Sequence, residues 1–131
     1  HIMVSTVTGV APFVSMIRSI DFNQTDFNIW VFEGASYIDE FGYLNELTSI
    51  SQKNKKVDFI PTCSRPNDPK NTKWKGKIGR VNEIFNSICN LEKAEKDNTI
   101  IYACGHPDMV SDVSEKYSNK FNFIEEKFWK P

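Results

Sequence analysis

The chain has 131 residues, enough for one ordinary domain with its own hydrophobic core but not for two. Its composition, with 40% hydrophobic, 13% aromatic and 25% charged residues, is typical of a globular protein and argues against disorder. A formal net charge of -1, with acidic and basic residues interspersed, argues against nonspecific binding of nucleic acid or anionic membranes, so any anion site must be local.

In the first half of the chain, short apolar runs alternate with segments of helical spacing. Ile2 to Thr6 predicts a first strand, and Pro12 to Ile20 predicts a helix. The apolar face of this helix would carry Phe13, Met16, Ile17 and Ile20. Asn28 to Phe32 predicts a second strand. Ser36 and Asp39 resemble a capping box, which predicts a helix from there to about Gln52.

The second half of the chain continues the same alternation. It predicts strands from Val57 to Thr62, Thr99 to Cys104 and Phe121 to Phe128, and helices from about Arg80 to Leu91 and from Pro107 to Tyr117. A long polar loop from Ser64 to Gly76 lies between them and is a candidate for function. The pattern predicts a three-layer α/β/α domain over residues 1–131, with a five-stranded parallel sheet.

The cysteines and the apolar runs limit the environment. Cys63, Cys89 and Cys104 are odd in number and lack a CxxC spacing, which argues against a disulfide framework and against a metal site. No apolar stretch is long enough to span a bilayer. We therefore expect a cytoplasmic protein that binds no metal, membrane or nucleic acid.

The turn from Thr6 to Phe13 joins the first strand to the first helix. Gly9 allows a ligand to approach the backbone closely, and the unpaired N–H groups of a helix N-terminus attract a pyrophosphate. A tight strand-to-helix connection that binds nothing is an equal alternative for this segment alone.

Six short segments follow one another in a distinctive order. They are TGVAPF from Thr8, GA from Gly34 with a helix motif from Asp39 to Leu47, CSRP from Cys63, GRV from Gly79, YACGHPDM from Tyr102 and EKFW from Glu126. Their order and spacing cover nearly the whole chain and resemble the NAD(P)-binding domain of the ferredoxin-NADP reductase family, of the bacterial ferredoxin/flavodoxin-NADP reductase type. The resemblance implies the strand order 3-2-1-4-5.

The resemblance also implies a set of cofactor-binding residues. Thr8, Gly9 and Pro12 would line the channel for the pyrophosphate and nicotinamide, and the Cys-Gly turn would contribute Gly105, Pro107 and Met109. Ser64, Arg65 and Arg80 would hold the 2'-phosphate of NADP(H). Guanidinium groups suit this task because they bind phosphate oxygens bidentately, although an arginine on a polar loop is otherwise more often a solvated surface charge.

Catalytic roles follow from the same resemblance. Cys104 would pack near the nicotinamide and help to orient it for hydride transfer, and Glu126 would assist at the junction of flavin and nicotinamide. Phe128 or Trp129 would lie against the flavin ring. Simple packing is the alternative for these side chains, and nothing nearby suggests that Cys104 is a nucleophile.

Four residues depart from the family pattern or weaken it. Val7 stands where the family usually has a glycine, Ser36 replaces an arginine, and His106 replaces an Asn or Ser, both of which are better helix N-caps. Glu33 ends the second strand, where an acid can accept from a ribose 2'-hydroxyl and repel a 2'-phosphate. Glu33 thus favours NAD, whereas the two arginines favour NADP.

The function implied is that of the NADP(H)-binding part of a flavoenzyme. It would pass hydride between NADPH and FAD, and electrons would go to or from ferredoxin or flavodoxin. The chain lacks an R-x-Y-S flavin motif, so we expect the FAD-binding domain to be absent from these residues and either to precede them in the full polypeptide or to be missing. The alternatives are an NADH-dependent reductase component of an oxygenase and a noncatalytic flavodoxin-like regulatory domain.

Overall fold

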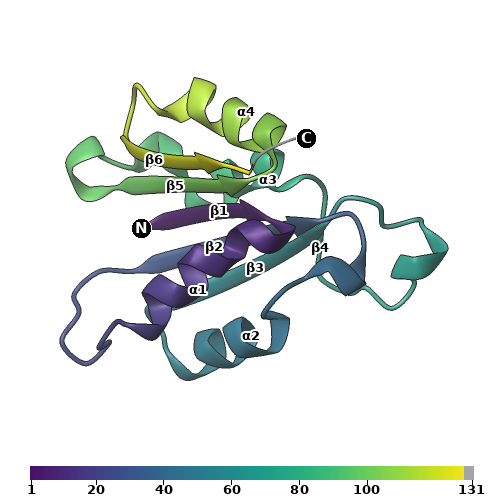
Figure 1. Cartoon of the computed structure of the whole chain (residues 1–131). Helices are drawn as coiled ribbons and strands as arrows, with labels where there is room; N and C mark the ends of the chain where they lie inside the picture. Colours follow the sequence, from purple (N-terminus) through teal and green to yellow (C-terminus); the bar gives the residue numbers. More distant parts are fainter. Residues whose placement is uncertain (129–131) are drawn as a thin grey trace.

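Within residues 1–128, six parallel strands form one sheet in the order β4-β3-β2-β1-β5-β6 (Figure 1). The structure is a computed structural model that describes residues 1–128. The strands are β1 (Ile2–Thr6), β2 (Ile29–Ala35), β3 (Val57–Cys63), β4 (Lys77–Ile78), β5 (Ile100–Gly105) and β6 (Asn122–Lys127). The predicted five strands and their order are confirmed, and β4 adds a short sixth strand beside β3.

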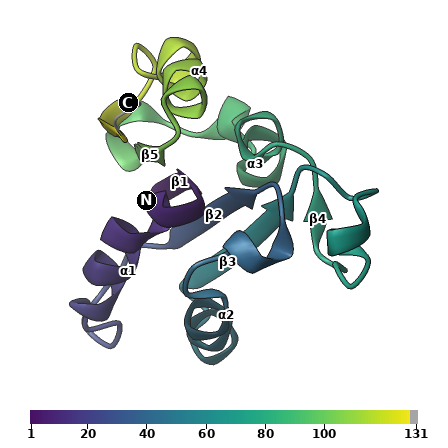
Figure 2. The same cartoon turned by 45° about the vertical axis from the view of Figure 1, so that its right-hand side comes forward.

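Four α-helices cover the two faces of the sheet (Figures 1 and 2). They are α1 (Ala11–Arg18), α2 (Leu44–Lys53), α3 (Val81–Cys89) and α4 (Pro107–Tyr117). Helices α1 and α2 pack on one face, whereas α3 and α4 pack on the other. Five short 3-10 helices complete the connections, at Val7–Val10, Ile38–Glu40, Pro69–Asn71, Leu91–Lys93 and Lys96–Asn98. In residues 1–128 no helix has both the length and the apolarity that crossing a membrane requires.

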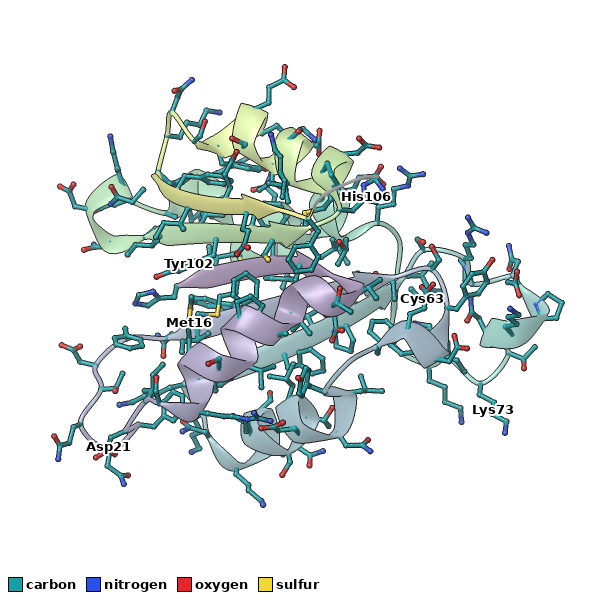
Figure 3. The ribbon with its side chains drawn as sticks, viewed as in Figure 1. Met16, Asp21, Cys63, Lys73, Tyr102 and His106 are labelled. Atoms are coloured by element: carbon teal, nitrogen blue, oxygen red, sulfur yellow. The ribbon has the colours of Figure 1, made fainter. Side chains whose placement is uncertain are left out.

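Two buried clusters form the core, one on each face, because successive strand residues point to opposite sides. On β1, Ile2 and Val4 enter the cluster under α3 and α4, and Met3 enters the cluster under α1 and α2. The apolar face predicted for α1 is partly wrong. Met16 is 41% exposed, and Val14 is buried instead. Figure 3 shows Met16 on this helix.

The connection from β2 to α2 differs from the predicted continuous helix. A 3-10 turn at Ile38–Glu40 comes first, and α2 begins only at Leu44, because Tyr43 adopts a left-handed conformation with φ of 60° that interrupts helical geometry. The predicted capping box is wrong as well. The Glu40 carboxylate accepts hydrogen bonds from the backbone N–H groups of Ser36 and Tyr37, at 3.0 and 3.1 Å.

Candidate functional site

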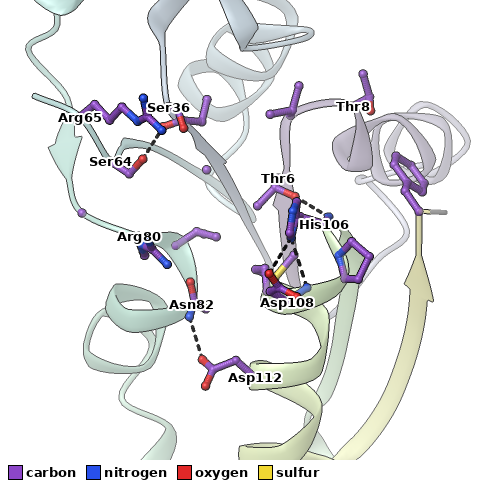
Figure 4. Close-up of a pocket in the computed structure, with 18 residues that line it drawn as sticks. Thr6, Thr8, Ser36, Ser64, Arg65, Arg80, Asn82, His106, Asp108 and Asp112 are labelled. Carbon is purple, nitrogen blue, oxygen red and sulfur yellow. Dashed lines mark hydrogen bonds and ion pairs between the residues drawn. The ribbon is translucent and has the colours of Figure 1, made fainter. Parts of the chain in front are cut away.

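A groove of about 800 Å³ lies at the carboxyl ends of β1, β2, β3 and β5 (Figure 4). The first residues of α3 and α4 and the side chain of Phe128 complete its walls. The strand order reverses between β1 and β5, and ligands of open α/β sheets bind outside the strand ends at such a point. The groove is large enough for a nucleotide-sized ligand.

One side of the groove is cationic. Figure 4 shows Ser64 and Arg65 close to Ser36 on this side, and Arg80 farther along it, near Asn82. Arg80 is the residue that precedes α3, and the Nη1 of Arg65 donates to the Tyr37 hydroxyl at 2.7 Å. None of the ion pairs within residues 1–128 involves either arginine. Both guanidiniums are exposed and are therefore available to an anion.

The opposite side is formed by the ends of β1 and β5 and by the start of α4. The backbone N–H of His106 donates to the Thr6 hydroxyl at 2.8 Å, and His106 Nδ1 accepts from the backbone N–H of Asp108 at 3.2 Å. His106 therefore caps α4 even though Asn and Ser are the better caps. Pro107 occupies the first turn of α4, and Met109 is buried there and lines the groove.

The turns after β1 and β5 pack backbone against backbone at this side. A Cβ atom added to Gly9 would lie 2.3 Å from the carbonyl oxygen of Cys104, and one added to Gly105 would lie 2.3 Å from the Thr6 hydroxyl. Gly105 also has a φ of +130°, which side-chain-bearing residues rarely adopt. The structure thus brings Gly9 together with Cys104, and both positions require glycine.

Cys104 and Glu126 face each other on neighbouring strands. They are paired in the parallel register of β5 and β6. Burial raises the pKa of the Cys104 thiol to about 11, and the nearby charge of Glu126 adds to the rise. Glu126 itself is exposed. Cys104 is therefore a neutral thiol near pH 7, which agrees with the expectation that it is not a nucleophile.

Six of the predicted cofactor-binding residues line the groove directly: Thr8, Ser64, Arg65, Arg80, Pro107 and Met109. Gly9, Gly105 and the two residues predicted to be catalytic, Cys104 and Glu126, belong to the adjoining contacts just described, and Pro12 lies in the first turn of α1. Trp129 lies outside the described residues. Phe128 lines the groove, and its backbone N–H donates to the Gly105 carbonyl at 2.9 Å.

The sequence reasoning missed three polar residues of the groove. Asn82 and Asp112 bridge α3 and α4 through a 2.8 Å hydrogen bond, and Asp108 lies near His106. Lys116 donates to Asp112 as well, and these bonds lower the pKa of that carboxyl. Asn82 and Asp112 lie on different helices, so no sequence spacing signals their pairing.

Val7 lines the groove and has a strained backbone conformation. Its φ of 47° falls in the left-handed region, where a β-branched residue is an outlier. The expected glycine at this position would adopt the same φ without strain. Val7 therefore holds this turn at an energetic cost.

Glu33 does not reach the groove, contrary to the expectation that it could contact a ribose. It is fully buried on the α1 and α2 face, where its Oε1 accepts from the backbone N–H of Gly42 at 3.0 Å. Within the described residues its Oε2 has no hydrogen-bond partner. Burial raises the pKa of Glu33 to about 8, so the carboxyl is mostly neutral at pH 7 and does not repel a phosphate across the sheet.

Comparison with known proteins gives consistent matches. The model of the oxidoreductase NAD-binding domain matches residues 3–115. Ferredoxin--NADP reductase B of Sorangium cellulosum is 25% identical over 118 residues, covering 87% of this chain and 46% of that protein. The chloroplastic leaf isozyme 1 of ferredoxin--NADP reductase from Arabidopsis thaliana is 30% identical over 122 residues, covering 87% of this chain and 33% of that protein.

A relative from an oxygenase system and a solved structure match as well. The xylene/toluene monooxygenase electron transfer component of Pseudomonas putida is 28% identical over 104 residues, covering 79% of this chain and 28% of that protein. A ferredoxin NADP+ reductase from Neisseria gonorrhoeae, solved with bound FAD and NADP, superposes with a TM-score of 0.77 at 22% identity, over 98% of this chain and 55% of that one. The chain spans about half or less of the three curated relatives. It belongs to the oxidoreductase NAD-binding domain family, as its motifs predicted.

Proposed function

We propose that this chain holds NADP(H) in the groove and presents the nicotinamide to a flavin carried by another domain. The observation that carries the proposal is the convergence of Ser64, Arg65 and Arg80 on one side of a groove at the carboxyl ends of the strands. A 2'-phosphate carries nearly two negative charges at pH 7, and two guanidiniums that form no ion pair within residues 1–128 match that charge.

With the 2'-phosphate at this side of the groove, the pyrophosphate and the nicotinamide would lie toward the other side. The turn with Thr8 and Gly9 would take the pyrophosphate, since it leads into α1 with Pro12 in the first helical turn. The nicotinamide would then lie toward Cys104 and Glu126. The neutral Cys104 thiol would support the ring by packing, and the exposed Glu126 carboxylate would be available to hydrogen-bond at the junction with the flavin.

The reaction of the whole protein is part of the proposal. NADPH would supply the hydride and FAD would accept it, with electrons exchanged with ferredoxin or flavodoxin in the cytoplasm. The relatives named ferredoxin--NADP reductase support this assignment, and the FAD-binding domain would lie outside these 131 residues. The protein's contribution at the site is binding, orientation and exclusion of water.

The second candidate is an NADH-dependent reductase component of an oxygenase. Ser36 favours it, because a serine there removes one cation that a 2'-phosphate could use. The oxygenase electron transfer component among the relatives favours it too. The burial of Glu33 argues against this candidate, because a buried Glu33 cannot accept a hydrogen bond from the free ribose 2'-hydroxyl of NADH.

Calorimetric titration with NADP+, NAD+ and 2'-phospho-AMP tests the proposal. We expect NADP+ to bind more tightly than NAD+, and Arg65→Ala or Arg80→Ala to weaken NADP+ by about tenfold or more while NAD+ changes by less than about twofold. Lys73→Ala in the same loop is the control, and Figure 3 shows this lysine on the outer part of the loop. Equal losses for both nucleotides would refute the phosphate clamp. The absence of saturable binding would favour a noncatalytic regulatory domain.

A further inference from the structure

Two residues outside the groove, Asn71 and Tyr37, hold the Arg65 side of the site in place. We infer that both are positioning residues for Arg65 and thereby set the preference for a 2'-phosphate. The inference rests on the proposed function. Neither residue lines the groove, and neither was singled out by the sequence motifs.

Asn71 ties the long loop after β3 to the connection after β2. Its side chain is 2% exposed, although it lies in a segment whose other residues are mostly exposed. The Nδ2 group donates to the carbonyl oxygens of Ser36 and Arg65, at 2.8 and 2.7 Å. The Oδ1 atom accepts from the backbone N–H of Ile38 at 3.0 Å. One buried amide thus joins two groove-lining residues, Ser36 and Arg65, that are far apart in the chain.

Tyr37 lies between the two contacts that Asn71 makes on the β2 side, at Ser36 and Ile38. This arrangement restrains the backbone on both sides of Tyr37. The Tyr37 hydroxyl then accepts from Arg65 Nη1 at 2.7 Å, and the Arg65 Cζ atom lies 5.3 Å from the centroid of the Tyr37 ring. Asn71 therefore fixes the Arg65 backbone directly, and it fixes the guanidinium through Tyr37.

Restraining Arg65 matters because a free arginine side chain loses rotamer entropy when it binds a phosphate. An exposed guanidinium on a loop samples many rotamers, whereas one held on an aromatic ring is already ordered. Lys70 adds a second cation on the same ring, with its Nζ 4.9 Å from the centroid. Two like charges gathered in this way raise the local potential for a dianion. The effect applies to the 2'-phosphate and not to the parts that NADP+ and NAD+ share.

The test compares NADP+ and NAD+ binding to four variants by calorimetry. Tyr37→Phe removes the hydroxyl acceptor and keeps the ring, and Asn71→Ala removes all three bonds of the amide. We expect Tyr37→Phe to weaken NADP+ about three- to tenfold and Asn71→Ala to weaken it at least tenfold, with NAD+ within about twofold of the parent. The matched controls are Tyr43→Phe, at an exposed tyrosine with Arg18 over its ring, and Asn67→Ala, at an exposed asparagine of the same loop. Both controls should leave the two affinities unchanged.

A double-mutant cycle separates positioning from general stability. In the Arg65→Ala background, Tyr37→Phe should have no further effect on NADP+, because the group it positions is gone. An equal loss in both backgrounds, or an equal loss of NAD+, would overturn the inference, and this readout stands even if Asn71→Ala does not fold. If the parent distinguishes the nucleotides through Arg65 but Tyr37→Phe and Asn71→Ala do not alter that ratio, only this inference fails. If the parent binds NADP+ and NAD+ equally well, both the proposed function and this inference are wrong.

Discussion

The two ends of the groove are built in different ways. At the end formed by β2 and β3, the proposed phosphate end, side chains make the site: Arg65 is held by a tyrosine hydroxyl and the loop by a buried amide. At the end formed by β1 and β5, the proposed nicotinamide end, the backbone of Gly9 packs directly against Cys104 and that of Gly105 against Thr6, with almost no room for a side chain.

This difference predicts how each end responds to change. A site made of side chains on a loop can lose one contact and keep its fold, so substitutions there should alter which nucleotide binds. A site made of packed backbone has no such freedom, so substitutions there should lower the stability of the whole sheet. Substitutions can test this contrast between the two ends of the groove.

Gly105→Ala should be severely destabilising. The new methyl group would meet the Thr6 hydroxyl, and the φ of +130° would be strained for alanine. We expect the free energy of unfolding to fall by about 3 kcal/mol or more, measured by urea denaturation. Gly42→Ala is the matched control, because the nearest atom to a Cβ there is 3.9 Å away. Similar losses in both variants would contradict the special role of the nicotinamide end.

Glu33→Gln should remove the part of the pH dependence of the free energy of unfolding that comes from this buried carboxyl. The pKa of Glu33 in the folded chain is about 8, above its ordinary value of 4.5, so the folded state holds the proton more tightly than the unfolded chain does. Stability should therefore fall as the pH rises from about 4.5 to about 8. At pH 9 the variant should exceed the parent by on the order of a few kcal/mol, and at pH 4.5 the gain should vanish.

Denaturation curves at several pH values would check this expectation. Glu92→Gln, at an exposed carboxylate, is the control and should follow the parent. A parent whose stability does not change between pH 5 and pH 9 would show that Glu33 is ionised and solvated, against the burial described here.

Val7→Gly should stabilise the chain modestly. Glycine adopts the φ of 47° without the steric cost that valine incurs, while the unfolded chain gains some entropy. We expect a net rise of about 0.5–1 kcal/mol in the free energy of unfolding, seen as a higher melting temperature. Val10→Gly, at a buried residue with a φ of -73°, should lower it instead. A loss at Val7 would mean that its side-chain packing outweighs the strain.

Glu126→Gln should have the smallest effect, a slight fall in the pKa of Cys104. Burial is the main cause of the raised pKa, and the charge of Glu126 is the lesser one. Alkylation of Cys104 at pH 9, followed by mass spectrometry, should become slightly faster, by less than about threefold, and Glu125→Gln should leave it unchanged. A large acceleration would indicate that the charge, and not the burial, controls the thiol.

The parts of the fold that were predicted correctly are those with strong periodicity. Helix α4 has the predicted bounds, and Val110 and Val113 are buried as its spacing indicated. The sheet order followed from the family motifs. Strand β4 was missed because two exposed residues at a sheet edge carry no alternating pattern. The start of α2 was placed too early because the break depends on the backbone angle of Tyr43, not on its residue type.

Some residues of the candidate site could likewise be predicted from the sequence, and others could not. Arg65 and Arg80 were singled out because the CSRP and GRV segments resemble family motifs and because guanidiniums suit a phosphate, and both line the groove. Asn71 was missed because an asparagine in a polar loop is ordinarily a solvated side chain, and only the packing of two distant segments buries it. Glu33 was expected at the end of the second strand because the predicted strand ended at Phe32, whereas β2 runs to Ala35 and Glu33 lies buried within it.

The central position of β1 affects the order in which the sheet can assemble during synthesis. Strand β1 pairs with β2 on one side and with β5 on the other, and β5 begins only at Ile100. The first 63 residues contain β1, β2 and β3, so a half-sheet can form early, but the other side of β1 then has no partner until most of the chain has left the ribosome. Chains truncated before Ile100 would expose that apolar edge and should aggregate.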